Sequence, residues 1–195
     1  RGTAGESTQR FQDQIAVKIN QLTRMLGPTV VEDQAVIGSD LFTADGATMG
    51  VLMKSKNAFL MRTSLSNDRS QRASADPDVT STTVTIAGKT VSLLSKPDNS
   101  VRSFLAEDDG YFLISNSETL VERFFEVGQS KQSLADTESF RLSRMLVPTS
   151  REDTIFAYFS PQMLQNLVSP EYMIELRRRK SAASEIALVH LARLA

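Results

Sequence analysis

The sequence of 195 residues contains no cysteine, which excludes disulfide bonds, thiolate metal sites and a cysteine nucleophile. Histidine occurs once, as His190, and one histidine cannot build the usual nitrogen-rich zinc site. His190 would also have to be the base of any serine triad, but the sequence has no Gly-x-Ser-x-Gly motif. We therefore expect a packed or helix-end histidine and no cofactor.

Charge and hydropathy point away from two further classes. The 22 basic and 23 acidic residues give a formal net charge of −1, so the whole chain offers no field for nucleic acid or an anionic membrane. No apolar run approaches the roughly 18 residues that a membrane-spanning helix needs. The hydrophobic share of 41% falls in periodic segments between turn signals, which is typical of a globular domain.

We expect both ends of the chain to be points of truncation. It begins at Arg1 without an initiator methionine and ends at Ala195 within an expected helix. We expect the chain to be a fragment of a longer protein, whose targeting or anchoring segment would lie outside it.

Apolar periodicity and turn signals predict a series of hairpins and helices. Apolar residues at three- and four-residue steps indicate helices, and a turn dipeptide between two apolar runs indicates a hairpin. The expected elements, in chain order, are a helix over 7–26, a hairpin over 35–53, a helix over 57–65, the frayed end of that helix with an exposed polar loop over 66–78, hairpins over 79–94 and 101–114, a helix over 115–128, a short helix over 136–146, a strand over 154–159, and helices from 161 and 170.

Polar residues ahead of the helices predict their caps. The expected N-caps are Asn57, Ser115 in a capping box with Glu118, Asp136, Ser160 and Ser169, and Gly128 and Pro148 are expected to end the helices before them. Gly88-Lys89-Thr90 resembles part of a phosphate-binding loop. The earlier glycine of that loop is replaced by Thr83 and a strand follows, so we expect a hairpin turn.

The elements together predict an α+β fold, with an antiparallel sheet built from hairpins and helices packed on one face. Similar segments, 41–46 and 104–110, each precede a strand and a helix, which suggests two related hairpin–helix units. We expect a single domain over 1–195, with sub-units 30–78 and 79–168 and a long C-terminal helix over 169–195.

Several short segments resemble an uncharacterised bacterial family with a domain of unknown function, found in large membrane-associated or secreted proteins. The segments are Gly38–Phe42, Asp109–Tyr111 followed by Asn116-Ser117, Ser133–Asp136, Ser160 ahead of Ser169-Pro170, and Arg177–Arg179. The resemblance covers most of the chain from about residue 35, and its motifs are structural punctuation. It implies a bacterial, envelope or secreted setting and supplies no catalytic residues.

The densest acidic cluster is Glu107, Asp108 and Asp109. Such carboxylates can bind calcium or share acid–base duty. Their position at the tip of a hairpin favours solvated turn residues, and the spacing of an EF-hand is absent.

The C-terminal helix carries the candidate interaction surface, which comprises Arg177, Arg178, Arg179, Lys180, Ile186, Val189 and Leu194. The basic run could contact phosphates or anionic lipid, but it wraps around the helix, and ion pairs with Glu171, Glu175 and Glu185 are the favoured interpretation. The last turns are apolar on nearly every side, and a helix of that kind is normally buried. We expect it to pack against another domain of the longer chain, a second copy or another protein.

The sequence therefore favours a non-catalytic binding or architectural module of a larger bacterial envelope protein. Two alternatives stay open: a carboxylate-based hydrolase using Asp108 and Asp109 with a basic partner, and attachment to an anionic membrane or nucleic acid through 177–180. The hydrolase would need acids of perturbed pKa in a pocket, and attachment would weaken steeply with salt. Nucleic acid is the less favoured partner, because stacking aromatic residues do not accompany the basic run.

Overall fold

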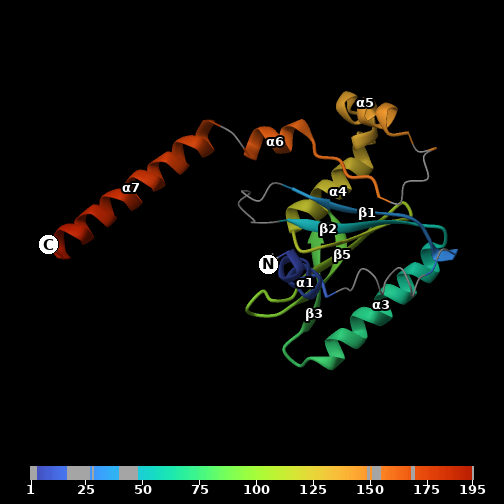
Figure 1. Ribbon diagram of the computed structural model, residues 1–195. Helices are drawn as coiled ribbons and strands as arrows, with labels where there is room; N and C mark the ends of the chain where they lie inside the picture. The colour runs from blue at the N-terminus through green and yellow to red at the C-terminus, as the bar shows by residue number, and fades with distance from the viewer. Residues whose placement is uncertain are drawn as a thin grey trace. The chain divides into compact units, whose positions relative to one another are not determined.

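The computed structural model describes residues 4–16, 27, 29–39, 48–148, 150, 155–167 and 170–194, apart from the side chains of 4–8, 165–167, 170, 172 and 194. The chain divides into two compact units, 1–132 and 133–195, and each is described by itself (Figure 1). This division falls inside the range 79–168 that the sequence suggests as a sub-unit.

The first unit is built around a six-stranded antiparallel sheet with the order β1-β2-β6-β5-β4-β3. The α+β class and the antiparallel sheet are therefore confirmed. The β5–β6 hairpin lies between the other two hairpins, so both suggested sub-units share one sheet. The elements of this unit are α1 (Ala4–Gln14), β1 (Val31–Gly38), β2 (Met49–Ser55), α3 (Ala58–Ala75), β3 (Thr80–Ile86), β4 (Lys89–Ser95), β5 (Arg102–Asp108), β6 (Tyr111–Ser115) and α4 (Glu118–Ser130).

Two of the three hairpins close with tight turns. Ala87-Gly88 joins β3 to β4 and Asp109-Gly110 joins β5 to β6, and all four residues have φ between 48° and 79°. Positive φ at both central residues is the geometry that matches the twist of antiparallel strands, and glycine adopts it without strain. The predicted turns are confirmed here, and because β4 begins at Lys89, no helix follows Gly88 as a phosphate loop would require. The predicted turn at Asp45-Gly46 lies outside the described residues.

Helices cover both faces of the sheet, whereas the sequence analysis placed them on one. Val51 and Met53 of β2 belong to a buried cluster with Met61 of α3. Leu113 of β6 belongs to a second buried cluster with Val121 of α4, on the opposite face (Figure 1). The central strands β2 and β6 carry consecutive apolar residues, and a strand of that kind is buried on both sides.

α1 is shorter than the predicted helix over 7–26. It ends at Gln14, and Ala16 has a left-handed φ of 56°, which interrupts a right-handed helix. Phe11 and Ile15 of the predicted apolar stripe are buried. The range 17–26 lies outside the described residues.

α3 (Ala58–Ala75) runs through most of the segment that was predicted to be a frayed helix end and an exposed polar loop. Its Asn57 cap is confirmed, because the Asn57 side chain accepts a hydrogen bond from the backbone N–H of Leu60 at 3.1 Å. The helix then continues to Ala75. The loop prediction over 66–75 is wrong because Arg69, in the middle of this stretch, is buried against the sheet, and tertiary contacts override a weak local propensity.

The cap of α4 is Ser117 and not Ser115. The Ser115 hydroxyl donates to the carbonyl oxygen of Met49 at 2.9 Å, so it serves the neighbouring strand. The Ser117 hydroxyl accepts from the backbone N–H of Leu120 at 3.3 Å, which satisfies one of the first free donors of the helix. The predicted capping box is therefore displaced by a tertiary hydrogen bond.

Gly128 lies within α4 and does not end it. The helix continues to Ser130, and Lys131, with a φ of 59°, forms the left-handed cap. A Cβ atom at position 128 would lie 2.6 Å from the Oδ2 atom of Asp108. Glycine at this position therefore allows α4 to approach the β5–β6 turn closely.

The second unit is helical in its described part. Its elements are the 3₁₀ turn η1 (Leu134–Asp136), α5 (Glu138–Leu146), α6 (Pro161–Leu167) and α7 (Pro170–Leu194). The end of the short helix before Pro148 is confirmed, as is the Ser160 cap, whose hydroxyl accepts from the N–H of Met163 at 3.1 Å. The predicted cap Ser169 lies outside the described residues.

Two predictions for this unit are wrong. Asp136 does not cap α5; its carboxylate closes η1 by accepting from the backbone N–H of Ser133 at 2.7 Å, and Thr137 precedes α5 instead. The segment 155–160 forms no strand. Alternating residues form a strand only beside a partner strand, and the described part of this unit supplies none.

Candidate interaction surface

The acidic turn between β5 and β6 is an ion-paired turn. Its acids lie against three different bases: Glu107 against Arg62, Asp108 against Lys89 at 2.6 Å, and Asp109 against Lys131 at 3.6 Å. Among the residues that the structure describes, no group of three or more potential ligand side chains could hold a metal ion. Asp108 and Asp109, the acids of the hydrolase alternative, are thus each matched by a neighbouring cation at a turn.

Arg69 on α3 is a buried cation whose side chain connects two strands. Its guanidinium donates to the carbonyl oxygens of Ser103 at 2.8 Å and Ser92 at 3.2 Å, and to the hydroxyls of the same residues. Burial lowers the pKa of Arg69 to about 10, so it stays protonated at neutral pH. All of these acceptors are neutral groups of the protein, and the arrangement holds α3 on β4 and β5.

The basic run lies on α7, and its four side chains are exposed. Successive helical residues are about 100° apart, so Arg177, Arg178, Arg179 and Lys180 face four directions around the helix. Arg179 donates to Glu175 at 3.2 Å, which confirms one of the predicted local ion pairs. Because these four side chains surround the helix, no one face of α7 is basic.

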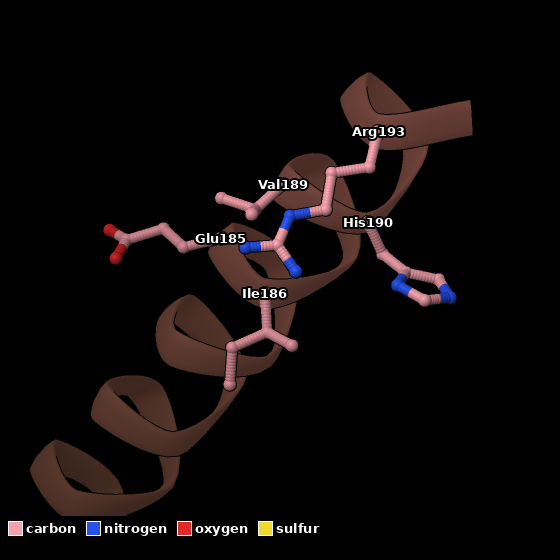
Figure 2. A pocket seen from close by; sticks show the side chains of 5 residues that line it. All are labelled: Glu185, Ile186, Val189, His190 and Arg193. Carbon is pink, nitrogen blue, oxygen red and sulfur yellow. The ribbon is translucent and has the colours of Figure 1, made fainter. Parts of the chain in front are cut away.

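The apolar turns that follow are also exposed. The side chain of Ile186 is 70% exposed and that of Val189 is 56% exposed, and the side chain of Leu194 lies outside the described residues. Figure 2 shows Ile186 and Val189 on one side of α7 near Arg193. His190, predicted to be packed or at a helix end, is exposed in the last turns of this helix.

The side chains in Figure 2 line an open depression of about 360 Å³. All of its lining residues, Glu185, Ile186, Val189, His190 and Arg193, come from α7. A ligand pocket encloses most of its ligand between several elements, which one helix cannot do alone. The depression is therefore better described as one side of a helix on which another surface can lie.

The described part of the second unit exposes large apolar side chains. Leu146 is 81% exposed and Ile155 is 86% exposed, and none of the described side chains over 133–193 is buried. The sequence analysis missed these two residues. A signal was present for Leu146, because the short helix that ends there carries several large apolar residues and needs a surface to cover them.

One small cluster holds α5 to the segment that follows it. The Phe140 ring lies edge-on to Tyr158 at 5.1 Å and to Phe156 at 6.1 Å. The Arg144 guanidinium lies 4.4 Å from the Phe156 ring centre, and the hydroxyls of Ser139 and Tyr158 are 2.8 Å apart. Aromatic pairs of this kind contribute about 0.5–1.5 kcal/mol each beyond their buried area, so the cluster shapes this segment without giving it a core.

In the described part of the chain, no helix combines the length and apolar character needed to cross a membrane. Comparison with protein-family models, with curated proteins and with solved structures found no match. The proposals below therefore rest on the residues of this chain.

Proposed function

We propose that this protein is an interaction module, in which the sheet unit is a self-supporting body and the helical unit associates with an apolar protein surface. The observation that carries the proposal is the contrast between the two units. The first unit buries Phe112, Phe125 and Met61 almost completely, whereas the described part of the second buries no side chain.

Energetics favour an association of the second unit. Fully burying a large apolar side chain stabilises by about 1.5–3 kcal/mol, and Met145, Leu146, Ile155, Phe159 and Ile186 are each more than 60% exposed. Large exposed apolar side chains in such number favour association with another protein surface. Association would bury these side chains and so stabilise the complex.

The two alternatives have less support from the described residues. The acids of the hydrolase alternative, Asp108 and Asp109, each lie against a lysine, and no observation favours one of them as a general base. The residues of the attachment alternative, 177–180, face four directions, so a flat anionic surface would contact only part of the run. The bacterial envelope setting stays a prediction of the resemblance.

The test is whether the apolar side chains of the helical unit are uncovered in the folded chain. The full chain and a variant with Leu146→Gln, Ile155→Gln and Phe159→Gln are compared for binding of a hydrophobic fluorescent dye and for mass across a concentration series. We expect dye binding or self-association by the parent chain and a clear loss in the variant, with unchanged circular dichroism.

A variant with Thr82→Gln, Thr83→Gln and Thr85→Gln on exposed positions of β3 serves as the matched control and should behave as the parent does. A parent chain that binds no dye and stays monomeric at every concentration would contradict the proposal, because its apolar side chains would then be covered within the molecule.

A further inference from the structure

One side of α7 carries a stripe with an ordered charge pattern. The members of this α7 stripe are Glu171, Glu175, Arg178, Ala182, Ile186, Val189 and Arg193. They follow one another at three- and four-residue steps, which places them on one face of a helix. All seven side chains are exposed, and Figure 2 shows the C-terminal three on the same side, flanked by Glu185 and His190.

The stripe changes character regularly along the helix. It begins with two acids and Arg178, has a small residue in the middle, and ends with two apolar residues and Arg193. Glu171 and Arg193 lie at equal sequence distances on either side of Ala182. An antiparallel copy of the same helix, centred on Ala182, would therefore place each Glu171 opposite the Arg193 of the other copy.

We propose that two copies of this chain associate by antiparallel pairing of their α7 stripes, centred on Ala182. This inference rests on the proposed function and names its partner, a second copy. The pairing is isologous, because the same residues are used by both chains.

The charges select the antiparallel orientation. Antiparallel pairing gives two Glu171–Arg193 contacts, and it also brings Arg179 to the Glu185 of the other helix. Parallel pairing in register would place Glu171 on Glu171 and Arg193 on Arg193, and like charges in such positions repel. The orientation thus follows from the order of charges along the helix.

The middle of the helix permits close approach. Ala182 lies within the run Ser181-Ala182-Ala183-Ser184, and small side chains at a crossing point bring helix axes to the short end of the 8–10 Å range. Towards each end, Ile186 lies opposite Arg178 and Val189 lies opposite Glu175. The aliphatic stems of Arg178 and Glu175 can cover the apolar side chains while the charged groups stay in water, and the Glu175 carboxylate already accepts from Arg179 of its own helix. The pairing therefore covers Ile186 and Val189, the apolar residues that line the depression in Figure 2.

The orientation can be measured directly, because the full chain contains no cysteine. A His190→Cys variant carries one spin label beside the stripe without altering its charges. Antiparallel pairing places the two labelled positions about 24 Å apart along the helix axis, from a rise of 1.5 Å per residue. Parallel pairing would place them about 10 Å apart. Pulsed electron–electron double resonance on the full chain would measure the longer distance, and dipolar broadening of the continuous-wave spectrum would reveal the shorter one.

The charge pattern is tested by a reversal and its rescue. We expect Glu171→Arg to weaken the dimer about tenfold, since two attractive contacts become repulsive. The double variant with Arg193→Glu should restore the parent affinity, which a merely structural effect would not do. Glu122→Arg, the same charge reversal at an exposed position of α4, is the matched control and should leave the affinity unchanged.

The possible outcomes separate this inference from the proposed function. A dimer with the labels near 24 Å and a rescued double variant supports the inference. A label distance near 10 Å, or a reversal without rescue, overturns the antiparallel pairing. A chain that binds the hydrophobic dye but stays monomeric also overturns it and leaves the proposed function standing, whereas a monomer that binds no dye contradicts both.

Discussion

Arg69 offers the sharpest test of how the sheet unit is held together. Its side chain is 6% exposed, and its guanidinium makes four hydrogen bonds to Ser92 and Ser103 on neighbouring strands. Arg69→Ala removes the donor of all four bonds and leaves a cavity beneath α3. Because carbonyl oxygens of both strands lose a charged donor in a dry environment, the free energy of unfolding should fall.

The size of the loss follows from opposing contributions. A hydrogen bond to a charged group contributes about 1.5–3 kcal/mol net, but the buried guanidinium also carries a desolvation cost that its removal relieves. Large-to-alanine changes in a packed site cost about 2–5 kcal/mol. We therefore expect Arg69→Ala to lower the free energy of unfolding by about 3 kcal/mol. Arg69→Lys should lower the free energy of unfolding by a smaller amount, because its ammonium group keeps the charge. Some loss should remain, because the ammonium group cannot reach both strands.

The assay is urea unfolding followed by far-ultraviolet circular dichroism. The matched control is Arg72→Ala, an exposed arginine nearly one turn further along α3, which should change the free energy of unfolding by no more than about 0.5 kcal/mol. A loss below about 1 kcal/mol for Arg69→Ala, with an unchanged urea dependence, would refute the reasoning, because water or nearby side chains would then satisfy the serine groups equally well.

Two further predictions concern the sheet unit. Gly50→Ala should lower the free energy of unfolding by about 1–3 kcal/mol in the same urea assay. The reason is that a Cβ atom there would lie 3.1 Å from the carbonyl oxygen of Ile114 and 3.2 Å from the Leu120 side chain. An unchanged urea midpoint would contradict this, because the strand would then have adjusted without loss of stability. The hydrogen bond from Lys96 holds the pKa of Asp76 below its usual range. The contribution of Asp76 to the free energy of unfolding is therefore present above the unfolded pKa of about 3.9, and it is lost as the pH falls through the lower folded pKa. Asp76→Asn should make the acid limb of a curve of unfolding free energy against pH shallower. An acid limb identical to that of the parent would contradict this prediction.

Local features of the sequence predicted the local features of the fold. Asn57 caps α3, and the turn at Asp109-Gly110 joins two strands as expected. In both cases the deciding forces act within a few residues: a side-chain oxygen meets a nearby N–H, or a glycine accepts a positive φ. Such features are determined before any distant contact forms.

Three of the failed predictions depend on a partner far along the chain or on the lack of one. The polar stretch 66–75 is helical because Arg69 is bonded to strands far along the chain. Ser115 cannot cap α4 because its hydroxyl serves Met49. The stretch 155–159 alternates like a strand, yet no neighbouring strand exists for it in the described part of its unit. A sequence pattern indicates the secondary structure that a residue prefers, but it does not show which distant group will hydrogen-bond with that residue.

The candidate interaction surface was predicted only in part from the sequence. The pattern of α7 indicated from sequence alone that Ile186 and Val189 belong to an interaction surface, and the structure leaves them exposed. The exposed Leu146 and Ile155 were missed, because their exposure depends on whether the folded unit covers them.

The sequence by itself determined the antiparallel hairpins, the class of the fold and the character of α7, because periodicity and turn residues act over short distances. Only the tertiary structure decided that β6 lies beside β2, that helices cover both faces, and that Arg69 is buried. These depend on contacts between residues far apart in the chain, whose energies are set by packing and by the pairing of buried polar groups.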